Sequence, residues 1–334
     1  MSHVPPAAAL PPAPLAAPHA RHDEPDRYVR HDEPDRYARH DEPDRHDLSD
    51  PSRLSAASGP RVPLLAVAHG TRDAAGLAAT AALVDEIRAL RPGLAVELAY
   101  VDVAEPLLAD TLARMAGPVV LVPLLLGAGY HVREDIPAAL AAAPHVQARI
   151  AGVLGPDPLL AEVLGERLAA AWAGTAAEAR DAQDHPQAVD EPGDSLWTER
   201  LAGCEAIVLA AAGSTDPGAN ADAARMAALL GALTGRPVVP SYLCAGAPTP
   251  AEAVAALHAD GVRNVAVSGY LMSPGYFARK AAGSGAAATA DPLGAHPALA
   301  RLALARYDEA LAQEASAAED AQEAHELRQE AHRN

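Results

Sequence analysis

The sequence predicts an α/β fold made by tandem duplication of a doubly wound parallel-sheet domain, with a cleft between the two halves. Short apolar runs alternate with longer amphipathic stretches, as in the strand–helix–strand units of a parallel sheet covered on both faces. This alternation occurs twice within 334 residues, a length that suits two domains. The chain is 50% apolar but only 3% aromatic, so we expect cores of Ala, Leu and Val.

The N-terminal half is expected at residues 61–173, where apolar runs predict strands and amphipathic stretches predict helices. The expected strands are Val62 to Ala68, Ala95 to Val101, Val119 to Leu125 and Val146 to Val153. The expected helices are Ala74 to Leu90, Glu105 to Met115, Glu134 to Ala143 and Pro158 to Trp172. In a doubly wound sheet the first and third strands are commonly neighbours, so the residues that follow them can converge.

The C-terminal half is expected at residues 201–313, after a linker at 174–200 that is rich in Asp, Gln, Pro and Gly. Its expected strands are Ala206 to Ala212, Val238 to Leu243 and Val262 to Ser268. Its expected helices are Ala219 to Leu233, Pro250 to Asp260 and His296 to Leu311. An acidic tail follows at residues 314–334, and the sequence does not decide whether it is helical.

Residues 1–60 are rich in Pro and Ala and then repeat with a period of nine residues, from Arg21, Arg30 and Arg39. Such a composition cannot form a packed core, so a disordered tail is expected. Each repeat places a histidine beside Asp and Glu, side chains that bind ions such as Co²⁺, Ni²⁺ or Zn²⁺. Two interpretations stay open: a solvated low-complexity arm and a metal-gathering arm.

Charge and composition exclude several classes of protein. With 26 basic and 44 acidic residues, the chain lacks the positive surface expected of a protein that binds nucleic acid or an anionic membrane. The longest apolar run, Val119 to Gly129, is too short to span a bilayer, and the start has no basic segment of a secretory signal, so we expect a cytoplasmic protein. Cys204 and Cys244 lack metal-site or disulfide spacing and are interpreted as structural.

The two halves also align residue by residue, with offsets of 139 to 146 positions. Residues that occur in both halves are interpreted as structural, because the shared fold needs them; an aspartate after the first strand, for example, can cap the next helix. These matched pairs are Asp73 with Asp216, Pro106 with Pro248, Tyr130 with Tyr276, and Arg133 with Arg279.

Ionisable residues of the first half that the second half lacks mark the candidate site. They are His69 against Ala212, Asp102 against Cys244, Glu105 against Ala247, and His131 against Phe277. All lie at or just after the expected carboxyl ends of strands, where open α/β sheets bind ligands. Two imidazoles with a nearby carboxylate would make a weak, open site for a divalent metal.

The third member of this site stays open between Asp102 and Glu105, and either carboxylate could instead serve the start of a helix. Glu134 and Asp135 are interpreted as acids in the first turn of a helix. No glycine-rich nucleotide motif and no Gly-x-Ser-x-Gly elbow is present in the sequence, so nucleotide binding and serine hydrolysis have no support.

The segments around the two histidines resemble a known family. Ala68-His69-Gly70-Thr71-Arg72-Asp73, together with Pro123 to Pro137 containing Gly127-Ala128-Gly129-Tyr130-His131, resembles the sirohydrochlorin chelatases, which are ATP-independent class II chelatases. The resemblance covers residues 60–313. It implies two similar chelatase-like, flavodoxin-like domains, insertion of a divalent metal into a modified tetrapyrrole, and His69 and His131 as metal-handling residues. The loss of both histidines from the second half looks like the form of this family with one active site.

The residues suit this chemistry. Histidine, with a reference pKa of ~6.5, can hold a metal or accept a pyrrole proton at neutral pH. For the carboxylates of the tetrapyrrole, the candidates are Arg72, Arg133, the Gly127–Gly129 loop with Tyr130, and the Gly213-Ser214 loop.

The expected metal is a substrate, Fe²⁺ or Co²⁺ and less so Ni²⁺, giving sirohaem or a cobalamin precursor; no tightly bound cofactor is expected. Few aromatic residues are available to line a protoporphyrin site, which disfavours a protoporphyrin ferrochelatase. The alternative is a non-catalytic protein that binds and delivers the metal or the tetrapyrrole. The oligomeric state is not indicated by the sequence.

Overall fold

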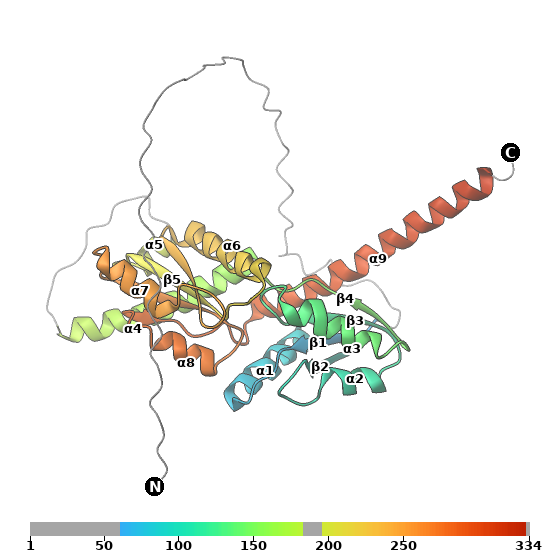
Figure 1. Cartoon of the computed structure of the whole chain (residues 1–334), viewed down its shortest axis with the longest axis horizontal. Coiled ribbons are helices and arrows are strands. Elements are labelled where there is room, and N and C mark those ends of the chain that lie inside the picture. Colours follow the sequence, from blue (N-terminus) through green and yellow to red (C-terminus); the bar gives the residue numbers. More distant parts are fainter. Residues whose placement is uncertain (1–60, 183–195, 332–334) are drawn as a thin grey trace, which may run out of the picture. The chain divides into compact units, whose positions relative to one another are not determined.

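The computed structural model describes residues 61–182 and 196–331, coloured along the chain in Figure 1. The predictions for residues 1–60, including the histidine repeats, fall outside these ranges. Within the described ranges, none of the helices combines the length and apolarity that a membrane span requires.

The first half contains a parallel four-stranded sheet in the order β2-β1-β3-β4. Its strands are β1 (Leu64–Ala68), β2 (Val96–Tyr100), β3 (Gly117–Pro123) and β4 (Val146–Ile150). All five residues of β1 are buried, as expected for the centre of a parallel sheet. The predicted adjacency of the first and third strands is confirmed, and the two strands therefore end at the same edge of the sheet.

The second half repeats this topology in a sheet ordered β6-β5-β7-β8. Its strands are β5 (Ala206–Ala211), β6 (Val238–Tyr242), β7 (Val265–Tyr270) and β8 (Ala288–Thr289). The strand predicted from Val262 begins three residues later, because the Val262 N–H still closes the preceding helix by donating to Leu257 O. Strand β8 was not predicted, since two small residues carry no pattern. The tandem duplication is confirmed.

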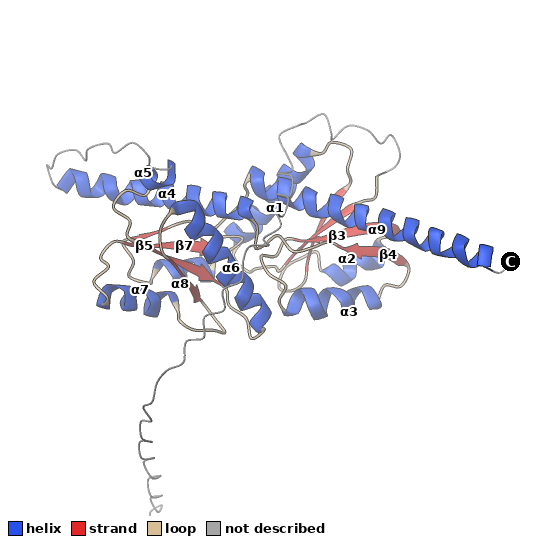
Figure 2. Cartoon of the chain, turned by 90° about the horizontal axis from the view of Figure 1, so that it is seen from above, coloured by secondary structure: helices blue, strands red, loops and turns tan. Residues whose placement is uncertain are grey.

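Helices flank both sheets, as Figure 2 shows. In the first half they are α1 (Ala74–Leu90), α2 (Leu108–Arg114), the π-helix η2 (His131–Asp135) and α3 (Ile136–Ala141). In the second half they are α5 (Leu196–Arg200), α6 (Pro217–Thr234), α7 (Pro250–Ala259) and α8 (Tyr276–Ala282). The predicted structural role of the paired aspartates is confirmed: Asp73 caps α1 at the Ala75 N–H, and Asp216 caps α6 at the Gly218 N–H.

The last helix of each half packs on the other half. Helix α4 (Pro158–Ala182) leaves the first sheet and packs against β7, β8 and α6, whereas α9 (Pro297–Ala331) leaves the second sheet and packs against α1 and β3. Hydrogen bonds follow the same exchange: Arg167 of α4 donates to Leu293 O, and Tyr307 of α9 donates to Val62 O. The largest apolar cluster consequently contains residues from both halves, while two smaller clusters fill the other face of each sheet.

Two helices are longer than the sequence patterns predicted. Helix α4 continues to Ala182, ten residues beyond the predicted end at Trp172, and α9 continues through the acidic segment to Ala331. Helix α5 also occupies the end of the segment expected to be a linker. The extensions are rich in Ala and, in α9, Glu, which favour helix without forming an apolar stripe, so amphipathic periodicity does not indicate them.

Candidate active site

His69 lies at the carboxyl end of β1, in a turn whose backbone is tightly held. Gly70, the next residue, has a positive φ of 100°, and a Cβ on it would come within 1.9 Å of Asp102 O. The Asp102 N–H donates a hydrogen bond to His69 O over 3.1 Å. Only glycine fits this left-handed conformation and this close approach, so the turn fixes the place from which the exposed imidazole of His69 projects.

His131 begins the π-helix η2, in the loop that follows β3. The glycine-bearing segment before it folds into a tight turn, in which Gly129 O accepts hydrogen bonds from the N–H groups of Val132 and Arg133. A single π-helical turn is uncommon and frequently lies at functional sites. The turn directs the half-buried ring of His131 toward the end of β1.

The two imidazoles meet. The Nε2 atoms of His69 and His131 are 3.1 Å apart, and their ring centroids are 4.3 Å apart in an edge-on arrangement. For a metal–nitrogen distance of about 2.1 Å, this separation corresponds to a ligand–metal–ligand angle of roughly 95°. Both nitrogens can therefore ligate one divalent ion at neighbouring positions.

Asp135 is a site residue that sequence reasoning assigned to a helix turn. Its Oδ2 accepts a hydrogen bond from Nδ1 of His131 over 2.6 Å. Because an ionised carboxylate only accepts, Nδ1 carries a proton, and the tautomer that this bond selects has its unprotonated Nε2 facing His69. The four-residue spacing of the two side chains was the available signal. The second half has Phe277 and Ala281 at these two positions, so it lacks the whole pair.

Asp102 and Glu105 lie on the loop after β2, and both side chains are exposed. Asp102 Oδ1 accepts from the Val103 N–H over 2.7 Å, and Glu105 Oε2 accepts from the Leu107 N–H over 3.2 Å. Neither carboxylate has a contact with the histidine rings among the interactions of residues 61–182 and 196–331. Over the same ranges, no group of three or more His, Cys, Asp and Glu side chains could hold a metal ion. The pair of histidines thus offers two candidate ligands and leaves the other coordination positions of an ion open.

The candidates for binding substrate carboxylates have partners within the protein. Arg133 pairs with Asp216 over 2.8 Å, and the Ser214 N–H donates to Asn220 Oδ1 over 3.0 Å. The Ala128 N–H, in the Gly127–Gly129 loop, donates to Asp222 Oδ2. Gly213 has a positive φ of 84°, and a Cβ on it would lie 3.0 Å from Cβ of Tyr242. Arg72 and Tyr130 are exposed, and the Tyr130 ring lies beside that of His131, with 6.3 Å between ring centroids.

Two groups near the site have perturbed acidity. The Arg279 guanidinium, which donates to Asp73 over 2.7 Å, holds the pKa of the Asp73 carboxyl below its usual value. Burial raises the pKa of the Tyr270 hydroxyl far above its usual value, and that hydroxyl donates to Leu126 O, just before the loop that carries His131. Asp73 therefore stays ionised beside the His69 turn, and Tyr270 stays a neutral donor that anchors the other loop.

Solved structures share this fold. SirB from Bacillus subtilis with Fe³⁺ superposes with a TM-score of 0.55 at 21% identity, covering 77% of this chain and 98% of that one. SirB from Bacillus subtilis subspecies spizizenii, a sirohydrochlorin chelatase in complex with cobalt, gives 0.51 at 19% identity, with 75% and 95% covered. At these identities the likeness shows the fold alone.

A curated relative and a family model match the sequence itself. A sirohydrochlorin cobaltochelatase of Sulfurisphaera tokodaii is 32% identical over 77 residues; the match spans 22% of this chain and 64% of the relative, less than two thirds of its length. The CbiX family model matches residues 63–171 and 206–310, once in each half and together over more than half of the chain. The chain therefore belongs to the CbiX family.

Proposed function

We propose that this protein, acting in the cytoplasm, inserts a divalent metal into sirohydrochlorin without ATP. The observation that carries the proposal is the meeting of His69 and His131 Nε2 atoms, 3.1 Å apart, at the carboxyl edge of one sheet. The family membership and the cobaltochelatase name of the curated relative support the same activity.

A two-histidine site suits an ion that must be passed on. Two imidazoles bind a divalent ion more weakly than the closed three- and four-ligand sites of resident metals, and they leave most coordination positions for water and for the ring nitrogens of the tetrapyrrole. The exposure of His69 keeps one side of the ion accessible to the incoming ring. We infer that each ring nitrogen that binds the ion replaces a water or a histidine until the ion has transferred.

Insertion also releases two protons from pyrrole N–H groups, one for each charge that the metal brings. A histidine that the metal leaves is neutral and close to the ring, so it can accept a proton and pass it to water. We assign this role to His69, whose exposed ring can reach water, and the role of fixed metal ligand to His131, whose Nδ1 is held by Asp135. Asp102 and Glu105, exposed at the rim beside the His69 turn, are proposed as the next proton acceptors.

Sirohydrochlorin carries many carboxylates, whereas the protein is acidic overall. The site therefore needs positively charged side chains and backbone N–H groups that bind those carboxylates. Arg72 and Arg133, with the loops at Gly127, Gly129 and Tyr130 and at Gly213 and Ser214, are proposed to supply them. Fe²⁺ and Co²⁺ are the proposed metals, giving sirohaem or a cobalamin precursor, because both accept imidazole ligands and the site itself imposes no further selection.

The test is an anaerobic absorbance assay of the full-length protein with sirohydrochlorin and Co²⁺ or Fe²⁺, without ATP. We expect catalytic conversion, lowered by at least ~10²-fold in His69→Ala and in His131→Ala if each acts as an essential ligand or base. His258→Ala is the matched control, because that exposed ring lies on α7 in the second half, where it hydrogen-bonds Val262 O after the end of the helix, and its loss should leave the rate unchanged. Normal rates in both site variants would refute the assignment. A spectral change that stops at one equivalent of protein would instead identify a carrier.

A further inference from the structure

The second half lacks the histidines but contacts both segments that carry them, through two matched ion pairs. Arg279 pairs with Asp73 over 2.7 Å, and Arg133 pairs with Asp216 over 2.8 Å. In each pair the aspartate caps the helix after the first strand of one half, and the arginine lies after the third strand of the other half. The pairs are thus the same contact made twice, once in each direction.

Both ion pairs lie near the candidate site, because each includes one residue of the first half that is close to a histidine in the sequence. Asp73 lies four residues after His69, and Arg133 lies two residues after His131 on η2. Their partners, Arg279 and Asp216, both come from the second half. Each histidine segment is therefore tied, by one ion pair, to the half that contributes no histidine.

Close approach of glycines accompanies each ion pair, to the backbone at the first pair and to the arginine side chain at the second. A Cβ on Gly76 of α1 would lie 2.8 Å from Pro274 O, and one on Gly275 would lie 3.7 Å from Cβ of Asp73. On the other side, a Cβ on Gly218 would lie 3.1 Å from Nη2 of Arg133. The charged groups consequently meet across surfaces that are already in contact, which restricts the geometry they can adopt.

Overall stability does not explain these pairs. Both arginines are largely exposed, with relative side-chain accessibilities of 69% for Arg279 and 55% for Arg133. Exposed ion pairs add little to the free energy of unfolding. Arg91 and Asp308 join the same two halves with two hydrogen bonds, of 2.5 and 2.7 Å, and Arg91 is only 12% accessible. That better-shielded pair lies at the far end of α1, about 27 Å from Asp73 by helix rise.

We propose that Arg279 and Asp216 are positioning residues, which hold the segments of His69 and His131 in the register that brings their Nε2 atoms together. The second half acts on the metal through these contacts and donates no ligand. The expected effect on kcat rests on the proposed function. The expected effect on Co²⁺ affinity rests only on the geometry of the two histidines.

The experiment is a double-mutant cycle of Asp73→Asn and Arg279→Gln, with Asp216→Asn as an independent variant. Asparagine still caps a helix, so the aspartate variants remove the charge and keep the cap. Each single variant is expected to lower kcat and the affinity for Co²⁺ alone, followed by its visible absorbance, by about 5- to 100-fold, the range of a small misplacement of reacting groups. The double variant should be no worse than either single, because both remove one interaction. In the Asp73 and Arg279 variants, neither of which touches a residue proposed to bind substrate, the KM for sirohydrochlorin should change little.

Arg91→Gln is the matched control, since it breaks an ion pair between the halves away from the histidines. It should leave kcat and Co²⁺ affinity unchanged even where it lowers the melting temperature. The inference is overturned if the Asp73 and Arg279 variants bind Co²⁺ and turn over like wild type, if their losses multiply in the double variant, or if Arg91→Gln shows the same loss. Absence of insertion by the wild type would refute the proposed function, and the Co²⁺ titration would still decide this inference.

Discussion

At the scale of single residues, the candidate site depends on which side chain each histidine can reach. Asp102 follows the end of β2 by two residues and Asp135 follows the end of β3 by twelve, and both are acidic. The π-helical turn brings Oδ2 of Asp135 to 2.6 Å from Nδ1 of His131, whereas Asp102 accepts a hydrogen bond from the N–H of the next residue, Val103. The carboxylate that orients His131 is thus selected by the backbone turn that carries both residues, four positions apart.

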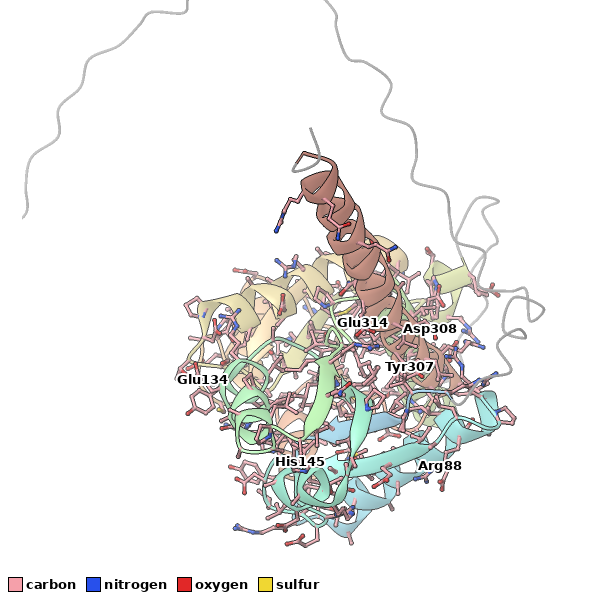
Figure 3. All side chains as sticks on the ribbon, turned by 90° about the vertical axis from the view of Figure 1, so that its right-hand side faces the viewer. Arg88, Glu134, His145, Tyr307, Asp308 and Glu314 are labelled. Carbon is pink, nitrogen blue, oxygen red and sulfur yellow. The ribbon has the colours of Figure 1, made fainter. Side chains whose placement is uncertain are left out.

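Asp135→Asn tests this orientation. An amide can donate to Nδ1 as well as accept from it, so the fraction of His131 with a free Nε2 should fall, and Co²⁺ affinity should decrease about 10- to 100-fold. Nitrogen NMR of the metal-free protein should show a gain of the Nε2-protonated tautomer. Glu134→Gln is the control, because Glu134 is exposed at the periphery of the molecule in Figure 3. An unchanged tautomer in Asp135→Asn would contradict the assignment.

At the scale of elements, helix α1 combines two functions. Its start carries the Asp73 cap and the ion pair to Arg279, and its buried Gly76 lets the second half approach closely. In an ordinary helix interior, alanine is preferred to glycine by ~1 kcal/mol. Glycine at position 76 therefore permits the contact, against local helix propensity.

Gly76→Ala should accordingly destabilise the protein although it improves helix propensity. The added methyl would lie 2.7 Å from Thr71 Cγ2 and 2.8 Å from the backbone oxygen of Pro274, and such overpacking typically costs about 1 to 3 kcal/mol. Gly174→Ala in α4 is the matched variant, because nothing lies within 4 Å of that position. It should stabilise by about 0.5 to 1 kcal/mol. Chemical denaturation of both variants measures these changes in the free energy of unfolding. A stabilised Gly76→Ala would show that α1 and the Pro274 segment do not touch as described.

At the scale of the whole molecule, exchange of the last helices makes the halves interdependent. Helix α9 covers α1 and β3 of the first half, and its Tyr307 and Asp308, labelled in Figure 3, bond Val62 O and Arg91. Helix α4 does the same for the second sheet. Without its partner, each half would expose the apolar residues of the shared cluster to water.

A chain of residues 61–182 alone is therefore not expected to be a folded monomer. Its first sheet would lack α9, and α4 would have no second sheet to pack against. Circular dichroism with light scattering should find it unfolded or self-associated, and coexpression with residues 196–334 should restore a folded complex. A stable, folded monomer would show that the shared cluster is not required.

The sequence by itself determined the duplicated α/β architecture, the adjacency of the strands that carry His69 and His131, and the absence of both histidines from the second half. These features follow from local periodicity and from comparison of the halves. Only the tertiary structure decided that Asp135 and not Asp102 or Glu105 contacts a histidine, that α4 and α9 exchange halves, and that Arg279 reaches Asp73, 206 residues away. Local patterns specify which face of an element is buried. Which partner covers that face, and which charges then meet, depends on contacts between distant segments that no periodicity encodes.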